Sequence, residues 1–181
     1  MFGPYLRGER VTLRPADDSD PPRFVPWFAD PEVTRYLGRR SAAALYQEVD
    51  FFKRVGESKT DVLWIIEVAG ESVGAIGIHQ IDWQNAHAVT GIVIGEKARW
   101  RSGVASEAMA LRTRYAFREL NLQKLTTEVF VDNVASRKAL EKNGYRTVGV
   151  HRHHFFTGGA WHDVWLGEVL RADWEKAQRQ T

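Results

Sequence analysis

The stretch Arg99-Trp100-Arg101-Ser102-Gly103-Val104-Ala105-Ser106-Glu107-Ala108 decides the fold of this chain. An apolar, β-branched run over residues 91–95 precedes it and predicts a buried strand. The residues after the turn that recur at helical spacing, and so predict a helix ending near residue 120, are Val104, Ala108, Leu111 and Tyr115. A strand, a small-residue turn and a helix direct free backbone N–H groups and a positive helix end at one point. Such a point favours an anion, and phosphate in particular.

Positive charge is concentrated around this turn. The 181-residue chain has a formal net charge of only +2, yet residues 97–118 carry a single acid, Glu107. The basic residues of this segment are Lys97, Arg99, Arg101, Arg112, Arg114 and Arg118. Local sequence leaves two interpretations open: a phosphate site, or a solvated basic helix face beside an ordinary turn. The turn lacks the Gly-Lys-Ser/Thr of a Walker loop and the three glycines of a dinucleotide fingerprint.

The turn resembles the acyl-CoA pyrophosphate loop of the GNAT acetyltransferases, Gln/Arg-x-x-Gly-x-Gly/Ala, and is most similar to the RimJ/RimL-like branch. The residues that match this branch are Trp100, Gly103, Ala105, Ser106, Glu107 and Ala108. Arg101 stands where the family usually has a second glycine, so the backbone must still turn at that position. The resemblance implies that the amides of residues 101–105 hold the phosphates of acetyl-CoA.

A second segment extends the resemblance. Residues 133–145, Asn-Val-Ala-Ser-Arg-Lys-Ala-Leu-Glu-Lys-Asn-Gly-Tyr, are similar to the family's Asn-x-x-Ser followed by Glu-Lys-x-Gly-Phe. Taken alone, Asn133 is explained as a helix cap and Ser136 as a first-turn residue. Together with the opening Arg10-Val11-Thr12-Leu13-Arg14-Pro15 and the late Asp163, the resemblance covers nearly the whole chain.

Length and composition indicate one acetyltransferase domain over residues 1–181. Hydrophobic residues make up 44% and charged residues 27%, as in ordinary globular proteins, and there is no cysteine. Disulfides and thiolate metal sites are therefore excluded. No run approaches the roughly 20 apolar residues of a membrane span. An export signal is not expected, since Pro4, Arg7, Glu9 and Arg10 interrupt the N-terminus, so we expect a cytoplasmic protein. A pI near 9.0 with so small a net charge does not argue for nucleic acid.

The resemblance implies the three-layer α/β/α GNAT fold of the α+β class, with about four helices and a strongly twisted, mostly antiparallel sheet of about six to seven strands. The expected strands are residues 10–14, 62–68, 73–81, 87–94, 124–131, 145–156 and 160–170. The expected helices are two fragments around a kink at Pro26 between residues 20 and 37, one from Ser41 to about Val55, the helix after the turn, and one capped by Asp132 or Asn133. Alternation places Val73, Ala75, Gly77, His79 and Ile81 on one face of their strand. The strands at 87–94 and 124–131 form a parallel pair that splays at its C-terminal ends, where a ligand can lie.

The resemblance also implies how the thioester is used. The pantetheine pairs with residues 92–94, a backbone amide of Val93 or Ile94 holds the oxyanion, and Ser136 donates to the departing sulfur. Side chains such as Arg99, Arg137 or Lys138 assist the phosphate-binding amides. The resulting set of cofactor-binding residues is Ile92, Val93, Ile94, Arg99, Trp100, Arg101, Ser102, Gly103, Val104, Ala105, Asn133, Ser136, Arg137 and Lys138.

The group that deprotonates the amine is less determined. An alkylamine has a pKa near ~10 and must lose a proton before attack. His79, with Asp82 just beyond it, is the first candidate base, and many relatives carry a glutamate where Val89 stands. A structural role for His79 and proton loss to water through a relay both stay open.

A histidine-rich hairpin closes the chain. His151, His153, His154 and His162 with Asp163 suggest a metal site, because imidazole and carboxylate are common ligands. Alternation, however, places His151 and His153 on one face and His154 on the other. A two-residue turn at Gly158-Gly159 would set His154 opposite Asp163 as an ion pair. A structural or acceptor-cleft role is therefore favoured, and no metal is predicted.

The resemblance thus implies an enzyme that moves an acetyl group from acetyl-CoA to a primary amine, either a protein N-terminus or a small amine, by direct attack in a ternary complex. The alternative is a non-catalytic member that binds acyl-CoA for sensing or assembly. RNA binding is weakly supported, because phosphate already accounts for the basic cluster.

A ribosomal-protein N-terminus, a polyamine, an amino sugar and an antibiotic all fit a cleft between the first helical pair and the last hairpin. Trp27 and Phe28 line that cleft or pack in the core, which is favoured. Asp30 and Glu32 attract a cationic acceptor or serve as caps. Rim-type relatives often pair, so a homodimer is an option.

Overall fold

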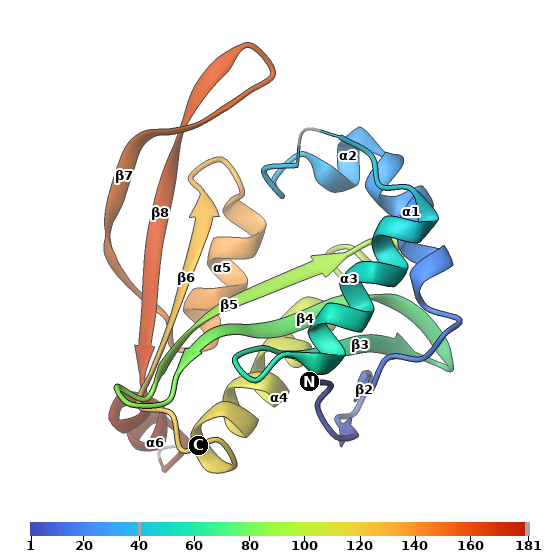
Figure 1. The fold of residues 1–181 in the computed structure, drawn as a ribbon. Helices are drawn as coiled ribbons and strands as arrows, with labels where there is room; N and C mark the ends of the chain where they lie inside the picture. The colour runs from blue at the N-terminus through green and yellow to red at the C-terminus, as the bar shows by residue number, and fades with distance from the viewer. Residues whose placement is uncertain (40, 180–181) are drawn as a thin grey trace.

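One twisted sheet of eight strands runs through the molecule in the order β1-β2-β3-β4-β5-β6-β8-β7 (Figure 1). The computed structural model describes residues 1–39 and 41–179. The strands are β1 (Leu6–Arg7), β2 (Thr12–Arg14), β3 (Val62–Val68), β4 (Glu71–Asp82), β5 (His87–Ile94), β6 (Lys124–Phe130), β7 (Arg146–Thr157) and β8 (Ala160–Leu170). All neighbours are antiparallel except β5 and β6, which are parallel. The mixed sheet with one parallel pair is confirmed, and the strand beyond the expected number is the two-residue β1.

Helices cover both faces of this sheet. The α-helices are α1 (Pro21–Ala29), α2 (Pro31–Thr34), α3 (Leu45–Glu57), α4 (Val104–Arg118), α5 (Val134–Lys142) and α6 (Arg171–Gln178), and a 3-10 turn, η1, covers Lys97–Arg99. In Figure 1, α1 and α3 lie in front of the sheet and α4 lies behind it. The described part of the chain therefore has six α-helices rather than about four. The short α6 was not predicted, because Trp174 is its one buried residue and the helix therefore has no apolar stripe. No helix in the described ranges is long and apolar enough to cross a membrane.

Two apolar cores hold the layers together. The larger lies between the sheet and α4, where Trp64 and Ile66 pack with Met109 and Phe117. The smaller lies under α1 and α3. Each such side chain contributes about 1.5–3 kcal/mol when fully buried. The division into two cores also corrects the prediction of which residues share a face of β4. Val73 and Ile81 join the α4 core, because register shifts at both ends of β4 interrupt the alternation.

Two helix starts differ from expectation. Pro26 lies inside α1 rather than at a kink, and the break instead falls at Asp30, whose carboxylate accepts from the backbone N–H of Glu32 at 2.8 Å and caps α2. The third helix begins at Leu45 and not near Ser41. Its start is set by the side chain of Gln47, which accepts from the N–H of Ala44 at 2.9 Å.

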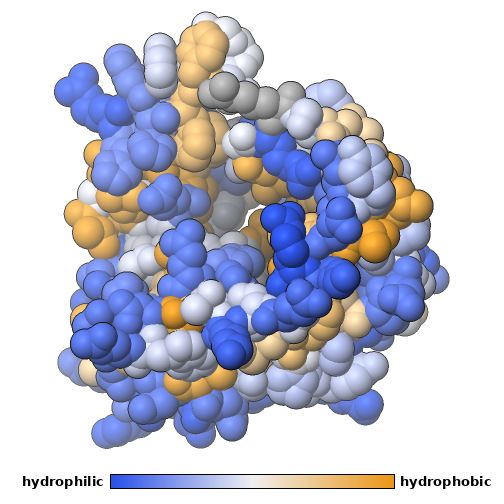
Figure 2. All heavy atoms as spheres, viewed as in Figure 1, coloured by the Kyte–Doolittle hydropathy of each residue, from blue (hydrophilic) through white to orange (hydrophobic). Residues whose placement is uncertain are grey.

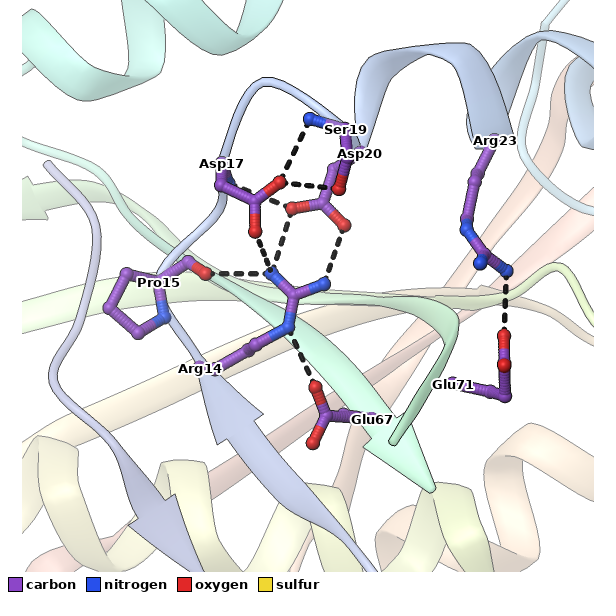
Figure 3. Close-up of polar contacts among 8 residues, drawn as sticks. All are labelled: Arg14, Pro15, Asp17, Ser19, Asp20, Arg23, Glu67 and Glu71. Carbon is purple, nitrogen blue, oxygen red and sulfur yellow. Dashed lines mark hydrogen bonds and ion pairs between the residues drawn. The ribbon is translucent and has the colours of Figure 1, made fainter. Parts of the chain in front are cut away.

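A charged cluster anchors the front helices to the sheet edge (Figure 3). The guanidinium of Arg14 donates to both carboxylate oxygens of Asp20 at 2.8 Å and to Glu67 at 2.9 Å. Asp20 is the N-cap residue of α1, but its side chain makes no cap bond, because Arg14 and the N–H of Asp17 occupy its oxygens. The carboxylates raise the pKa of Arg14 further above its usual range, chiefly through the bond to Asp20. The cluster therefore fixes where α1 begins.

Candidate active site

Strands β5 and β6 part soon after they pair. Their register runs from His87 opposite Lys124 to Val89 opposite Thr126 and then stops. Beyond that point β5 stays paired with β4 as far as Ile94, and β6 stays paired with β8. We call the opening between residues 90–94 and 127–130 the strand split. Figure 2 shows this face hollowed between the side of the molecule formed by β7, β8 and α5 and the side formed by α1 to α3.

Threonine hydroxyls close the base of the strand split. The Thr90 hydroxyl donates to the Thr126 carbonyl at 3.0 Å, and the Thr127 hydroxyl donates to the Thr90 carbonyl at 3.2 Å. Side chains therefore bridge the strands where a backbone ladder would otherwise continue. The parallel pair that the sequence predicted is splayed as expected.

The register decides which main-chain groups face the strand split. The N–H of Gly95 donates to the Val73 carbonyl on β4 at 2.9 Å, whereas the Thr90 carbonyl accepts from β6. Because main-chain groups alternate in direction along a strand, Val93 faces β4 while Ile92 and Ile94 face the split. The Ile94 carbonyl is occupied by the Trp100 indole N–H at 2.9 Å. The amides of Ile92 and Ile94 are thus the ones aimed into the opening.

The turn before α4 has the conformation that the sequence requires. Arg101 has φ 60° and Gly103 has φ 88°, both in the left-handed region. Glycine adopts this region freely, while a residue such as Arg101 does so at a cost of about 1 kcal/mol. Gly103 is the N-cap of α4, and no side chain of the described residues caps the helix, so its first-turn N–H groups point outward. The turn therefore presents an uncapped helix end beside the strand split.

The N-terminal segment is docked onto this helix end. The carboxylate of Glu107 accepts from the N–H groups of Glu9 at 2.5 Å and Arg10 at 3.0 Å. A Cβ on Gly103 would lie 2.7 Å from Nη1 of Arg10, so the missing side chain leaves room for that guanidinium. No sequence signal indicated that Arg10 lies beside the turn. Glu107, the single acid of the basic segment, is thereby assigned a structural partner.

The basic segment is not one solvated face. Lys97 lies 2.8 Å from Asp30 and 2.9 Å from Glu32, and these bonds raise its pKa well above the usual range. Arg118 lies over the Trp174 ring, and Arg112 is buried. The basic residues left exposed or half-exposed in the turn itself are Arg99 and Arg101. Asp30 and Glu32 are therefore committed to α2 and Lys97.

The second segment lies on α5. Asn133 caps this helix by accepting from the N–H of Ser136 at 3.2 Å. The Ser136 side chain is half-buried, and its hydroxyl has no hydrogen-bond partner within residues 1–39 and 41–179. Arg137 lies 3.6 Å from Glu141 within the helix, and Lys138 is exposed. The Ser136 hydroxyl is thus free to bond a ligand.

His79 lies on the α1/α3 face of the sheet, at the root of the strand split. It stands opposite Val89 in the register, and its ring covers two glycines. Cβ atoms on Gly77 and Gly91 would lie 2.4 and 3.5 Å from its Nε2. Its Nδ1 is 3.2 Å from Oδ1 of Asp61, a partner that no sequence signal indicated.

Two effects keep the His79 imidazole neutral. Burial lowers the pKa of His79, Asp61 partly offsets this, and the charge of Arg112 lowers it further. Asp82, the neighbour considered from the sequence, bonds instead to Asn85 at 2.7 and 2.8 Å. A bulge in β4, with Gln80 at φ 51°, separates His79 from Asp82. A neutral imidazole with its Nδ1 held by a carboxylate presents Nε2 as a proton acceptor.

Aromatic contacts join the first helical pair to the last hairpin. The rings of Tyr36 and Phe130 have centroids 5.8 Å apart, and Phe130 stacks on Phe155 at 5.0 Å. Trp27 packs flat against Gly95, where a Cβ would clash with its ring, and Phe28 packs beside it in the smaller core. Core packing of these two aromatic residues, favoured from the sequence, is confirmed.

The hairpin histidines are arranged differently from the prediction. Residues 152–154 bulge out opposite Asp163, so His154 is not paired with that carboxylate. Asp163 instead accepts from the N–H of His153 at 2.8 Å, and His154 lies 3.9 Å from Glu128. His151 and His154 share one side, with ring centroids 5.0 Å apart. In the described ranges no group of three or more His, Cys, Asp or Glu side chains is placed to hold a metal ion.

These features agree with comparisons to known proteins. The family described as "Acetyltransferase (GNAT) domain" matches residues 10–146, and the chain belongs to it. The uncharacterized N-acetyltransferase YoaA of Bacillus subtilis (strain 168) is 32% identical over 176 residues, covering 94% of this chain and 98% of the relative. The uncharacterized N-acetyltransferase p20 of Bacillus licheniformis is 27% identical over 93% of this chain and 97% of its own length. The chain is therefore an acetyl-CoA-dependent N-acetyltransferase of the GNAT family.

A solved structure supports the fold. The spermidine N-acetyltransferase from Vibrio cholerae, in complex with CoA and spermine, superposes with a TM-score of 0.86. It covers 93% of this chain and 99% of its own at 19% identity. At that identity the likeness carries the architecture alone.

Proposed function

We propose that this enzyme transfers the acetyl group of acetyl-CoA to a primary amine by direct attack within a ternary complex. The observation that carries the proposal is the strand split beside an uncapped helix end. The N–H groups of residues 101–105 are suited to bind the diphosphate of the cofactor, and the open edge of β5 is suited to bind its pantetheine arm. Arg99, Arg137, Lys138 and, newly, Arg10 are the basic side chains placed to assist, and Asn133 orders the first turn of α5.

The thioester carbonyl needs a donor for the charge that develops on its oxygen. The alternation along β5 supports the amides of Ile92 and Ile94 for this role over that of Val93, whose N–H faces β4. A backbone donor is fixed before the reaction starts, so no reorganisation is needed when the charge appears. Losing one such donor typically costs about 3 kcal/mol.

Two side chains move the protons. His79 accepts the ammonium proton at Nε2 while Asp61 keeps its Nδ1 protonated, so the amine attacks in its neutral form. His79 occupies the place beside Val89, where many relatives carry a glutamate. The Ser136 hydroxyl donates to the sulfur as the carbon–sulfur bond breaks.

The acceptor is proposed as a primary amine without further restriction. A cationic acceptor drawn by Asp30 and Glu32 is less well supported, since Lys97 neutralises both carboxylates. Spermine is bound in the structure of the Vibrio relative, and a polyamine is accordingly one class to test. Protein N-termini, amino sugars and amine antibiotics are the others.

Titration calorimetry with acetyl-CoA, followed by thiol release with a panel of amines, tests the proposal. Binding with transfer to at least one amine is expected. Binding without transfer to any acceptor would favour the sensing alternative. Absence of binding heat, or a cofactor seated away from residues 101–105, would remove the proposal altogether.

A further inference from the structure

Arg112 is the most unusual buried residue of the molecule. It lies on α4 with 1% of its surface exposed and extends to the sheet where the strand split begins. Its Nη2 donates to the Tyr145 hydroxyl at 3.1 Å, and its Nη1 lies 3.4 Å from the Gly91 carbonyl. Its Nε has no hydrogen-bond partner, and no carboxylate lies within ion-pair distance, among residues 1–39 and 41–179.

Such an arrangement does not favour stability. A guanidinium keeps its charge in proteins, and an unpaired buried charge carries a large desolvation penalty. An apolar side chain of similar size would fill the same space without that penalty. The position of Arg112 therefore needs an explanation other than packing.

The contacts of Arg112 lead across the base of the split. The Tyr145 hydroxyl lies 3.0 Å from the Thr90 hydroxyl, which in turn bonds the Thr126 carbonyl on β6. The side chain of Arg112 is thus connected to both strands at the point where they separate. The Thr90 and Thr127 hydroxyls occupy the space in which the ladder between β5 and β6 would continue, and Arg112 reaches them through Tyr145.

Gly91 separates Arg112 from His79. Its carbonyl faces the guanidinium, and the side chain it lacks would point at Nε2 of His79, at 3.5 Å. The backbone of Gly91 therefore contacts the cation on α4, and the imidazole lies over the same glycine on the opposite face of the sheet.

We propose that Arg112 is a positioning residue for acetyl transfer, which holds the splayed geometry of β5 and β6 through Tyr145 and Thr90 and keeps a fixed positive charge beneath the floor of the acceptor site. The inference rests on the proposed function, because it assigns Arg112 a task in that reaction. A positive charge at this place disfavours protonated groups above it and favours the anions that form on the thioester oxygen and sulfur.

The charged groups around His79 define the expected pH effect. Asp61, just before β3, favours the imidazolium, whereas Arg112 on α4 disfavours it. The N-terminal ammonium lies beside Asp61, and the facing β5 residues Val89 and Gly91 carry no charge. Removing the charge of Arg112 while leaving Asp61 in place must therefore raise the pKa of His79.

The test compares Arg112→Met and Arg112→Gln, which remove the charge, with Arg112→Lys, which retains it. Arg118→Met, on the same helix but over the Trp174 ring, is the matched control. The pKa of His79 is measured by NMR titration of its ring protons, and kcat is measured against pH. The neutral variants should raise the pKa of His79 and move the acid limb of kcat upward by the same amount. Their turnover at neutral pH should fall roughly tenfold. Arg112→Lys and Arg118→Met should keep the wild-type titration.

A merely structural role for Arg112 predicts a different result: lower thermal stability with an unchanged His79 titration, which would overturn the inference. Arg112→Gln keeps a hydrogen-bonding head, so the test survives if Arg112→Met does not fold. Tyr145→Phe removes the connection to Thr90 but leaves the charge. It should lower kcat without shifting the acid limb, and wild-type kcat in this variant would exclude the contribution of this connection. The NMR titration needs no acceptor, so it decides this inference even if wild-type enzyme acetylates no amine and the proposed function fails.

Discussion

Arg14 and Arg112 are both arginines withdrawn from solvent, but their surroundings are opposite. Arg14 lies among Asp17, Asp20 and Glu67 at the sheet edge (Figure 3). Arg112 lies beneath the strand split, where its acceptors among the described residues are a hydroxyl and a carbonyl. The comparison separates two uses of a buried guanidinium. The paired guanidinium of Arg14 fixes a helix in place, whereas the role proposed for Arg112 depends on a charge that no carboxylate among the described residues neutralises.

The largest expected effect concerns stability in these two regions. Arg14→Met leaves the buried Asp20 carboxylate uncompensated and should lower the free energy of unfolding by about 3–5 kcal/mol. Arg112→Met removes an unpaired cation and should change it by less than about 1 kcal/mol, or raise it. Urea unfolding measures both. Arg23→Met is the control, because its pair with Glu71 at 3.0 Å is exposed and should matter little. Equal losses for Arg14→Met and Arg112→Met would erase the distinction.

The next effect concerns the imidazole above Arg112. The pKa of His79 is lowered from its usual 6.5, so the neutral base is present above that lowered value and is lost as pH falls through it. The rate of the wild-type enzyme should therefore decline on the acid side of pH 6.5. His79→Gln should reduce kcat about a hundredfold or more and abolish that acid limb. A pH–rate profile that His79→Gln leaves unchanged would retire His79 in favour of a water relay.

A smaller effect is expected at the leaving group. Ser136→Ala should lower turnover about tenfold to a hundredfold, since a thiolate is a moderate leaving group that needs only partial help. Affinity for acetyl-CoA by calorimetry should be retained, because the helix cap at this position uses the backbone N–H of Ser136. Unchanged turnover would remove Ser136 from the mechanism.

The smallest effect sharpens the account of the split itself. Thr90→Val deletes a buried hydroxyl that connects Tyr145 with β6 and should cost about 1 kcal/mol in urea unfolding. Thr113→Val is a matched control on α4, because the buried Thr113 hydroxyl has no hydrogen-bond partner among the described residues. It should be neutral or stabilising. A loss at Thr113 as large as that at Thr90 would show that burial, rather than the bridging bond, sets the cost.

The elements of the fold were predictable where local chemistry alone decides them. The sharp turn at Gly103 and the cap at Asn133 follow from residues within a few positions, and both occur as expected. The bulge opposite Asp163 does not, because it depends on how two strands slide past each other. The pairing of His79 with Asp61 could not be predicted either, because the β3–β4 register brings together two residues that are 18 positions apart.

Arg112 shows a signal that was present but outweighed. It lies four residues after Ala108 and four before Ala116, both fully buried, and so on the apolar stripe of α4. Its charge instead suggested a solvated or phosphate-binding face. Helical spacing predicts its position better than its charge does, because the position on the helix decides which side chains face the core. A cation can be buried there if hydroxyls and carbonyls accept hydrogen bonds from its N–H groups.

The hydrogen bond from the Trp100 indole to the Ile94 carbonyl has a consequence for which acyl donors the enzyme accepts. It fastens the turn before α4 to the end of β5, so the two cannot shift independently. In the proposed binding mode the diphosphate lies at the turn and the thioester oxygen lies at β5, so this bond sets the distance between the two contacts. A thioester on a shorter arm would fall short of the Ile92 amide, and one on a longer arm would reach past it. Either would be a poor acyl donor, however well its phosphates were held.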